Sequence, residues 1–410
     1  MPVALRSEPA FVRWATAEGV SLLGSAVTTV VLPLVVYDAT GSAAKTGILF
    51  ALRAAPYLLL GLIAGPVADH GDRRRLIIGG NLAQGVLVAT IPLAQLFHHL
   101  TIAHIYAVAV LSAVAWVFAD AAVFGAVPAI VGRERLAAAN GVLSSLQSAS
   151  DIGGPVCAGL LVAGVGAVNA VWVDAASFIF AAAVQVRIRG DFRTSPRSVE
   201  SPTVRATIRR ATRYVRDHRV IATLLVAGFG NSFGFGIIIG LLVPYAVEHL
   251  SIEVGDGRVA FLFGALGVGS LIAGVSLARV FRPRRVRVIT PASLVVSALL
   301  AAMLAASHSY GMALIVIALF SCSITLTIMI GITYRQLAVP DDLRSSVNVM
   351  GRMIAWGGQP FGAVCGALIA SFSTVVAAYG VAAAVMAISA LGAGASLRHR
   401  AALAELAEAS

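Results

Sequence analysis

Long apolar segments alternate with short polar segments along nearly the whole chain. A helix needs roughly 20 apolar residues to cross a hydrocarbon layer about 30 Å thick, and each of these segments is long enough. With polar positions or Pro/Gly breaks as boundaries, the pattern predicts twelve helices, near residues 11–37, 43–67, 75–97, 101–131, 136–165, 167–187, 218–248, 256–281, 284–306, 309–338, 341–371 and 374–397. We therefore expect an all-α membrane protein with twelve transmembrane helices.

Composition indicates the same class of protein. Of the 410 residues, 59% are hydrophobic and 12% are charged, and the mean hydropathy is +0.90. A water-soluble domain could not bury that much apolar surface. The first apolar run, residues 15–37, is too long for the core of a cleaved signal peptide, so we expect it to be retained as a transmembrane helix.

The positions of the arginines predict the orientation in the membrane. Arginines gather at alternate connections between the predicted helices, namely at 73–75, 133–135, 187–219, 279–287, 335–344 and 398–400. By the positive-inside rule this side is cytoplasmic, which places both termini in the cytoplasm of a plasma-membrane protein. Topology then accounts for the net charge of +11, and we do not expect nucleic acid as a partner, because no soluble domain is present to bind it.

Two segments of the chain recur at nearly the same spacing. The sequence "LIAG" at 62–65 is found again at 271–274, an offset of 209. The sequence "GPVCAGLL" at 154–161 matches "GAVCGALI" at 362–369, an offset of 208. Two separate matches that agree within one residue indicate a tandem repeat.

The repeat predicts how the chain divides into domains. A single long basic connection separates the two halves, and its second part is expected to form an amphipathic helix on the anionic inner membrane surface. We expect an N-terminal six-helix bundle over residues 1–187, a basic cytoplasmic linker over 188–217, and a C-terminal six-helix bundle over 218–410.

The stretch "GPVADHGDRRR" at 65–75 resembles a motif of a known family. It is similar to the G-x-x-x-D-R-x-G-R-R turn of the major facilitator superfamily, with matching residues at Gly65, Asp69, Arg73 and Arg74. It departs from that turn at two positions, where His70 replaces an arginine and Asp72 replaces a glycine.

Other motifs resemble the drug and siderophore exporter branch of that superfamily, which includes the enterobactin exporter and macrolide efflux proteins. They are "SLLGSAVTTVVLPLVVY" at 21–37, "L-x-x-AN" at 136–140, "DAASF" at 174–178 and "PDDLRSSV" at 340–347. The resemblance implies two pseudo-symmetric six-helix bundles that rock about a site near the middle of the bilayer.

The resemblance also gives the turn at 65–75 the role of a cytoplasmic gate. Asp69 would face the positive N-terminus of the predicted helix 341–371, with Arg344 in its first turn, and so hold the cytoplasmic side closed. In the same turn, Gly65 fits a close approach of two backbones. Arg73 and Arg74 fix the orientation in the membrane, and Asp72 neutralises neighbouring positive charge. The alternative is a solvated turn that only anchors the topology.

Five charged residues lie inside the predicted spans: Glu18, Arg53, Asp120, Asp151 and Arg352. Because an ionised side chain at the centre of a membrane helix costs about 2.5–3.5 kcal/mol, each is a candidate functional residue. A carboxyl group in a dry cavity can take up and release a proton, so the three acids are candidates for proton coupling. The alternatives are that Glu18 reaches the inner membrane surface and that Asp120 pairs with an arginine.

Arg53 and Arg352 are candidates for binding a substrate in the cavity, or else for pairing with a carboxylate of the protein. Further candidates for the substrate cavity are aromatic or polar residues within the predicted spans: Trp116, Gln147, Asn231, Phe235, Tyr334, Trp356 and Gln359. For these residues, core packing or contact with lipid is the alternative. Asp174 is expected to be a cap or local packing residue, because the resemblance places its helix toward lipid.

A proline and several glycines interrupt the helix predicted at 136–165. Its sequence "SASDIGGPVCAG" loosely resembles the Gly-Pro element of antiporters in the superfamily. Pro155 leaves a backbone carbonyl without its helical partner and bends the helix, while Gly154 and Gly159 permit close packing. This bend favours an exporter.

Together these features predict a secondary active transporter, a proton-coupled antiporter that exports amphipathic compounds such as drugs, antibiotics or siderophores by alternating access. Two alternatives stay open: a sensor or scaffold without transport activity, and a symporter that imports a small metabolite. The sequence has no phosphate loop, no "HE-x-x-H" or "G-x-S-x-G" motif, and no metal-binding cysteine spacing. We therefore expect no enzyme activity, cofactor or metal; the expected partners of a monomeric chain are its substrate, protons and lipid.

Overall fold

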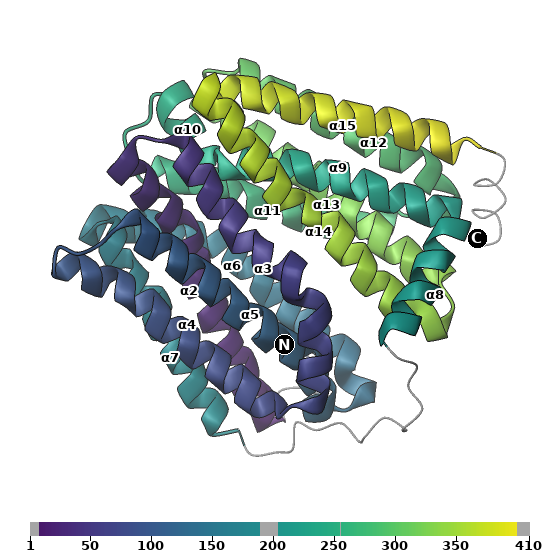
Figure 1. Ribbon diagram of the computed structural model, residues 1–410, viewed down its shortest axis with the longest axis horizontal. Coiled ribbons are helices and arrows are strands. Elements are labelled where there is room, and N and C mark those ends of the chain that lie inside the picture. The colour runs from purple at the N-terminus through teal and green to yellow at the C-terminus, as the bar shows by residue number, and fades with distance from the viewer. Residues whose placement is uncertain (1–7, 189–203, 255, 400–410) are drawn as a thin grey trace. The chain divides into compact units, whose positions relative to one another are not determined.

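The computed structural model describes residues 8–188, 204–254 and 256–399, apart from some side chains within the helices. All regular elements in these ranges are helical (Figure 1). Twelve helices in the described residues are long and apolar enough to cross a membrane, which confirms the predicted number and class. A helix pairs most of its backbone groups within itself, as a bilayer requires.

The long helices of the first half are α2 (Pro9–Thr40), α3 (Ala43–His70), α4 (Arg73–Leu96), α5 (Ile102–Val131), α6 (Leu136–Val165) and α7 (Ala167–Val186). Those of the second half are α9 (Arg219–Gly240), α11 (Arg258–Val280), α12 (Val286–Ala306), α13 (Tyr310–Ala338), α14 (Asp341–Phe372) and α15 (Val375–Leu397). Short elements join them: η1 (Arg133–Arg135), α8 (Val204–Asp217), α10 (Leu242–Pro244), η2 (Tyr245–His249) and η3 (Pro283–Arg285).

One predicted helix is interrupted. The pattern predicts a continuous helix over 218–248, but α9 ends at Gly240 and the chain continues as the single turn α10 and the π-helical turn η2. Pro244 lacks the N–H that would bond to the carbonyl of Gly240, so one hydrogen bond of the α-helical ladder is missing at the point where α9 ends. Hydropathy alone does not register the break, because the residues on both sides of it are apolar and buried.

The described chain forms two compact units. Unit 1 consists of residues 1–41, 52–196 and 252–264, and unit 2 consists of residues 42–51, 197–251 and 265–410. Each unit therefore includes a short segment from the other half of the sequence: the first turns of α3 belong to unit 2, and the first turns of α11 belong to unit 1. The amphipathic helix α8 belongs to unit 2.

The helices of the two units pack in the same order. In unit 1, α2 packs against α6 and α7, and α4 packs against α5 and α7. In unit 2, α9 packs against α14 and α15, and α12 packs against α13 and α15. Figure 1 shows α12 and α15 side by side along their length. The repeat in the sequence is thus matched by a repeat in helix packing.

Small residues bring α9 and α14 into close contact in unit 2. A Cβ added at Gly358 or Gly362 of α14 would overlap the carbonyl oxygens of Phe229 and Phe233 on α9. On α9, a Cβ added at Gly236 would likewise overlap the carbonyl oxygen of Gln359 on α14. Glycines spaced four residues apart let membrane helices approach until their backbones touch.

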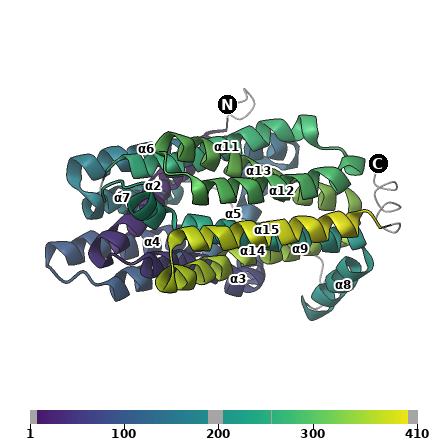
Figure 2. The same cartoon turned by 90° about the horizontal axis from the view of Figure 1, so that it is seen from above.

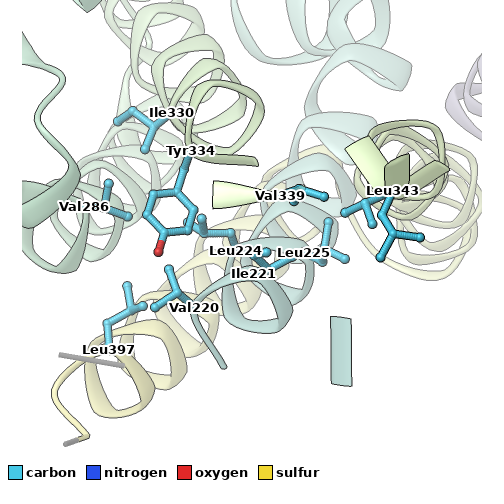
Figure 3. Close-up of a cluster of buried hydrophobic side chains, with 11 residues drawn as sticks. Val220, Ile221, Leu224, Leu225, Val286, Ile330, Tyr334, Val339, Leu343 and Leu397 are labelled. Atoms are coloured by element: carbon cyan, nitrogen blue, oxygen red, sulfur yellow. The ribbon is translucent and has the colours of Figure 1, made fainter. Parts of the chain in front are cut away.

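A cluster of buried apolar side chains closes one end of unit 2 (Figure 3). It joins α9, α12, α13, α14 and α15, with the ring of Tyr334 among aliphatic side chains that include Val220 and Leu397. Helix α8 lies along the ends of α9 and α14 (Figure 2). Its Tyr214 packs on the cluster and donates a hydrogen bond from the hydroxyl group to the carbonyl oxygen of Ala338, 3.0 Å away.

Candidate functional site

Unit 1 encloses a cavity of about 320 Å³ between its helices. The cavity is large enough for a drug-sized ligand, since ligand pockets start at roughly 300 Å³. Its wall comes from α2, α3, α4, α5 and α7 and is mainly apolar, with polar groups at a few positions. The polar and aromatic lining residues are Glu18, Ser21, Ser25, Thr28, Arg53, Asn81, Gln84, Ser112, Trp116, Asp120, Asp174 and Phe178.

Two acidic residues share part of this wall. Glu18 comes from α2 and Asp120 from α5, and their carboxylates lie close enough for their charges to repel each other. Two like charges in a region of low dielectric constant disfavour the doubly ionised state. The pair can therefore hold a proton, or hold the positive charge of a ligand.

Arg53 and Asp174 form a second polar group on the same wall. The Arg53 guanidinium donates from Nη2 to Thr29 Oγ1, 3.1 Å away, and Thr29 Oγ1 donates to the carbonyl oxygen of Ser25, 2.7 Å away. Ser25 Oγ in turn donates to Asp174 Oδ1, 3.2 Å away. Two hydroxyl groups of α2 thus connect the arginine of α3 with the aspartate of α7, and the opposite charges of Arg53 and Asp174 attract each other.

The expectation that Asp174 is a cap or packing residue facing lipid is wrong. Its side chain is 2% exposed and lines the cavity. A glycine explains how α7 reaches this position, because a Cβ added at Gly24 of α2 would overlap Ser177 Oγ and lie 3.0 Å from the Asp174 Cα. The signal in the sequence was the presence of an acid within an apolar helix, which the resemblance led us to discount.

Trp116 is the large aromatic side chain of the cavity. It is 40% exposed, and its ring centroid lies 5.8 Å from that of Tyr57, which follows Arg53 by one turn of α3. Of the predicted site residues, Trp116 and Arg53 line this cavity together with Glu18 and Asp120. The sequence did not single out Asn81 and Gln84 of α4, although both line the same cavity.

A small pocket of unit 2 lies between α9, α13 and α14, with a volume of about 10 Å³. That is room for about one water molecule. Arg352 and Trp356 line it, as does Arg335, which is 3% exposed and packs against the backbone of Gly351. The like charges of Arg335 and Arg352 repel each other.

The other predicted cavity residues lie outside these two spaces. Gln147 is exposed and donates from Nε2 to Asp151 Oδ1, 2.8 Å away on the same helix, α6. Asn231 is fully buried, and its Nδ2 donates to the carbonyl oxygen of Ile324, 3.3 Å away. Phe235 stacks on Phe320, with ring centroids 6.5 Å apart, while Gln359 takes part in the α9–α14 contact through its backbone.

The turn between α3 and α4 is held by local contacts. Asp72 is the N-cap of α4, where its carboxylate accepts from the Arg75 backbone N–H at 3.2 Å and pairs with the Arg75 side chain at 3.3 Å. Arg74 donates to the carbonyl oxygen of Val186 at the end of α7, 2.6 Å away, and Arg73 is buried. These contacts account for the local conformation of the turn.

The predicted latch between Asp69 and Arg344 lies outside the side chains that the structure describes. The reason given for Gly65 is not supported by the described neighbours, because a Cβ added there would meet none of their heavy atoms within 4 Å. In α6, by contrast, Gly154 does permit a close approach, since a Cβ there would overlap the Cβ of Ala26 on α2. Pro155 lies inside the same helix, and Gly159 packs beside Gly257 and Ala260 of unit 1.

Two histidines of unit 2 meet where η2 approaches the connection between α12 and α13. The ring centroids of His249 and His308 are 4.2 Å apart, and Tyr245 is 5.3 Å from His249. Burial and the nearby charge of His308 lower the pKa of His249, against a smaller opposite effect of a hydrogen bond with the Ser307 backbone. Burial raises the pKa of Tyr245 to about 12, and its hydroxyl donates to the carbonyl oxygen of Leu304, 2.9 Å away.

Comparison with known families identifies the chain. Residues 15–357 match the family described as Major Facilitator Superfamily, which is most of the chain and reaches into both halves of the sequence repeat. The chain belongs to the Major Facilitator Superfamily. A member of this superfamily is a multi-pass membrane transporter for small molecules, and this chain shares that fold rather than the fold of an enzyme family.

Curated relatives of this superfamily member are efflux proteins. It is 26% identical over 361 residues to the multidrug efflux pump Tap of Mycolicibacterium fortuitum, which covers 83% of this chain and 84% of the pump. It is 28% identical to the Tap pump of Mycobacterium tuberculosis (strain ATCC 25618 / H37Rv), over 65% of each protein. It is 24% identical to macrolide efflux protein A of Streptococcus pyogenes, over 64% of this chain and 65% of that protein.

Solved transporters share the fold of this superfamily member. A bacterial homologue of the human lysosomal transporter Spinster, in an inward-facing and occupied conformation, aligns with a TM-score of 0.71 at 15% identity, over 100% of this chain and 97% of the other. The nucleoside transporter NupG aligns with a TM-score of 0.75 at 11% identity, over 96% of this chain and 100% of the other. At these identities the likeness concerns the fold alone.

Proposed function

We propose that this transporter exports amphipathic small molecules in exchange for protons, by alternating access between two six-helix domains, 1–187 and 218–410. The observation that carries the proposal is the cavity of unit 1, where Glu18 and Asp120 face the same space as Trp116. A wall that combines apolar surface, an aromatic ring and a carboxylate pair suits a compound with an apolar body and a basic group.

Proton exchange follows from the repulsion between the two acids. When no substrate is bound, one proton shared by Glu18 and Asp120 relieves that repulsion, and a bound cation does the same. Binding of substrate and binding of a proton therefore compete, which is the requirement for antiport. One proton that moves inward through about 100 mV releases roughly 2.3 kcal/mol for export.

The direction of transport rests on the relatives. Proteins named multidrug efflux pump and macrolide efflux protein match most of this chain or nearly two thirds of it. We place the protein in the plasma membrane with both termini in the cytoplasm, on the basis of its arginines, and propose that it acts as a monomer. Asp69 and Arg344 then close the cytoplasmic side, and the turn of Asp69 also contains Gly65, Asp72, Arg73 and Arg74. Asp151 has a subsidiary role in proton coupling, and the pocket of Arg352 has a subsidiary role in substrate binding.

The test is transport into inverted membrane vesicles, whose outer surface is the cytoplasmic face. With the vesicle interior made acidic, labelled erythromycin should accumulate inside vesicles that contain the wild-type protein. Glu18→Gln and Asp120→Asn should each lower this accumulation at least about tenfold, because a carboxylate in the cavity supplies the exchange. The matched control is Asp38→Asn, an exposed acid of the same helix α2 outside the cavity, which should transport like the wild type.

Two results would contradict the proposal. One is accumulation that does not respond to the imposed pH gradient in the wild-type protein. The other is accumulation in both Glu18→Gln and Asp120→Asn vesicles equal to that of the wild type, which would remove the acids from the coupling mechanism.

A further inference from the structure

Asp174 and Arg53 do not have an evident place in the exchange of a proton at Glu18 and Asp120. They line the same cavity but lie at another part of its wall, since Ser25 is seven residues beyond Glu18 on α2. Seven residues correspond to about two turns, or roughly 10 Å along the helix axis. The cavity therefore has one acidic region around Glu18 and a second region that contains both signs of charge.

The second region is built for an ionised carboxylate. Asp174 is almost fully buried, and the Ser25 hydroxyl donates to its Oδ1 at 3.2 Å. The Ser177 hydroxyl lies 3.5 Å from the same oxygen and makes its shorter hydrogen bond to the Asp174 backbone carbonyl, at 2.8 Å. The Arg53 guanidinium is oriented by Thr29 of the same α2 segment. A buried charge is tolerated when an opposite charge and hydrogen-bond donors compensate for the lost water, and both kinds of compensation are present.

We propose that Asp174 is a positioning residue that holds Arg53 on the α2–α3 wall and cancels its charge, so that the substrate encounters only the charge of Glu18 and Asp120. This inference rests on the proposed function for its consequence in transport. The charge balance itself is a property of the protein alone and can be measured without a substrate.

A count of formal charges gives the expected effects. With all groups ionised, the four ionisable residues among the described lining residues, Glu18, Arg53, Asp120 and Asp174, sum to −2. Asp174→Asn changes the sum to −1 and leaves Arg53 without its counter-charge. Arg53→Met changes it to −3, and the double variant restores −2.

Trp116 can report this charge because it lines the cavity and its ring lies beside that of Tyr57. Tyr57 is one helical turn from Arg53 on α3. The experiment measures quenching of its fluorescence in the purified protein by iodide, an anion, and by acrylamide, which is neutral. The chain has four tryptophans, so the signal of Trp116 is taken as the difference between each protein and the same protein with Trp116→Phe.

We expect the ratio of iodide to acrylamide quenching to rise about twofold or more in Asp174→Asn, since one unit charge at about 10 Å changes the local ion concentration by at least that factor. The ratio should fall in Arg53→Met and return to the wild-type value in the double variant. The matched control is Asp38→Asn, an exposed acid of the same unit outside the cavity, which should leave the ratio unchanged.

An unchanged ratio in a folded Asp174→Asn protein would overturn the inference, because it would mean that Asp174 does not carry a charge. A double variant that stays as far from the wild type as the single one would also overturn it. If Asp174→Asn does not fold, the decrease in Arg53→Met and the wild-type ratio in Asp174→Glu provide the same test.

The effect on transport is measured as accumulation of labelled erythromycin in the inverted membrane vesicles described above. Asp174→Asn should lower accumulation of this basic compound several-fold, and the double variant with Arg53→Met should recover most of it. If the wild-type protein does not transport erythromycin, the proposed function is in doubt while the quenching result still decides the role of Asp174. If quenching follows the charge count but transport is unaffected, the charge balance does not act on the substrate and the inference fails.

Discussion

The α2–α6 contact of unit 1 and the α9–α14 contact of unit 2 are equivalent by the sequence repeat, yet they differ in small residues. At the repeat offset of 208, Gly154 corresponds to Gly362, while Ala158 corresponds to Gly366. Unit 2 also has Gly358, whose equivalent in unit 1 is Ser150. At these three positions α6 has one glycine and α14 has three, and a Cβ at Gly358 or Gly362 would overlap the backbone of α9.

The helix pairs α4–α5 and α12–α13 differ in a second way. In unit 2, hydroxyl groups fill the interface: Ser293 Oγ lies 2.7 Å from Thr327 Oγ1, and Ser297 Oγ donates to Ser323 Oγ, 3.0 Å away. In unit 1, the corresponding helices place Asn81, Asp120 and Trp116 around the cavity. The same order of helices thus produces a cavity of about 320 Å³ in one unit and a pocket of about 10 Å³ in the other. The side chains at the helix contacts, rather than the order of the helices, distinguish these two spaces.

The largest effect should come from adding volume at the close contact of unit 2. Gly362→Ala places a Cβ where it would overlap the carbonyl oxygen of Phe233, a backbone atom that cannot rotate away. We expect a loss of about 1–3 kcal/mol in the free energy of unfolding, seen as a lower midpoint in thermal unfolding of the detergent-purified protein. Gly392→Ala is the control, because no described heavy atom lies within 4 Å of its added Cβ. Equal midpoints for the two variants would show that the close packing of unit 2 is not needed for stability.

A smaller effect is expected at the contact of α2 with α7 in unit 1. Gly24→Ala would displace the Ser177 side chain and press on the Asp174 backbone, and so separate Ser25 from Asp174. We expect a loss of about 1 kcal/mol in stability, together with a several-fold loss of erythromycin accumulation, because the wall of the cavity moves. The control is Gly153→Ala, whose Cβ would lie in ordinary contact with Leu23, 3.7 Å away. A variant with unchanged transport would mean that the position of Asp174 does not matter.

The hydroxyl groups of unit 2 should affect stability but not transport. Ser323 donates to the carbonyl oxygen of Ser293, 2.7 Å away, and accepts from Ser297. Ser323→Ala leaves the Ser297 hydroxyl without this acceptor and should cost about 0.5–1 kcal/mol, with accumulation in vesicles within about twofold of wild type. Ser371→Ala, which removes an exposed hydroxyl bonded within its own helix, should change neither quantity. A tenfold loss of transport in Ser323→Ala would show that unit 2 binds substrate through these groups.

The smallest effect concerns the histidines at the end of unit 2. Because the pKa of His249 is lowered in the folded protein, the unfolded chain binds the proton more tightly. Stability from this group is present above about pH 6.5 and is lost as the pH falls through the lowered pKa. His249→Gln should remove that part of the acid sensitivity and change the difference in unfolding midpoint between pH 7.5 and pH 5.5 by less than about 2 °C. A larger midpoint difference in the variant than in the wild type would contradict the lowered pKa.

The helices could be predicted from the sequence because hydropathy and breaks are local properties. The span from Leu136 to Val165 has the predicted limits, whereas the break at Gly240 required attention to Pro244 within an apolar run. The wall formed by Glu18, Arg53, Trp116 and Asp120 could be anticipated because charge inside a membrane is costly.

The placement of Asp174 could not be predicted in the same way. It depends on the rotation of α7, which the close approach at Gly24 fixes and which a single sequence does not reveal. The closed packing of unit 2 could have been suspected from Gly358, Gly362 and Gly366, a four-residue spacing typical of touching helices.

The attachment of α8 changes the length of the connection between the halves. Tyr214 fastens this helix to the end of α13, and α8 counts as part of unit 2. The second part of the basic connection is therefore an ordered helix of unit 2. The exposed Arg209 and Arg213 therefore belong to unit 2, and a basic helix surface of this kind attracts anionic lipid headgroups.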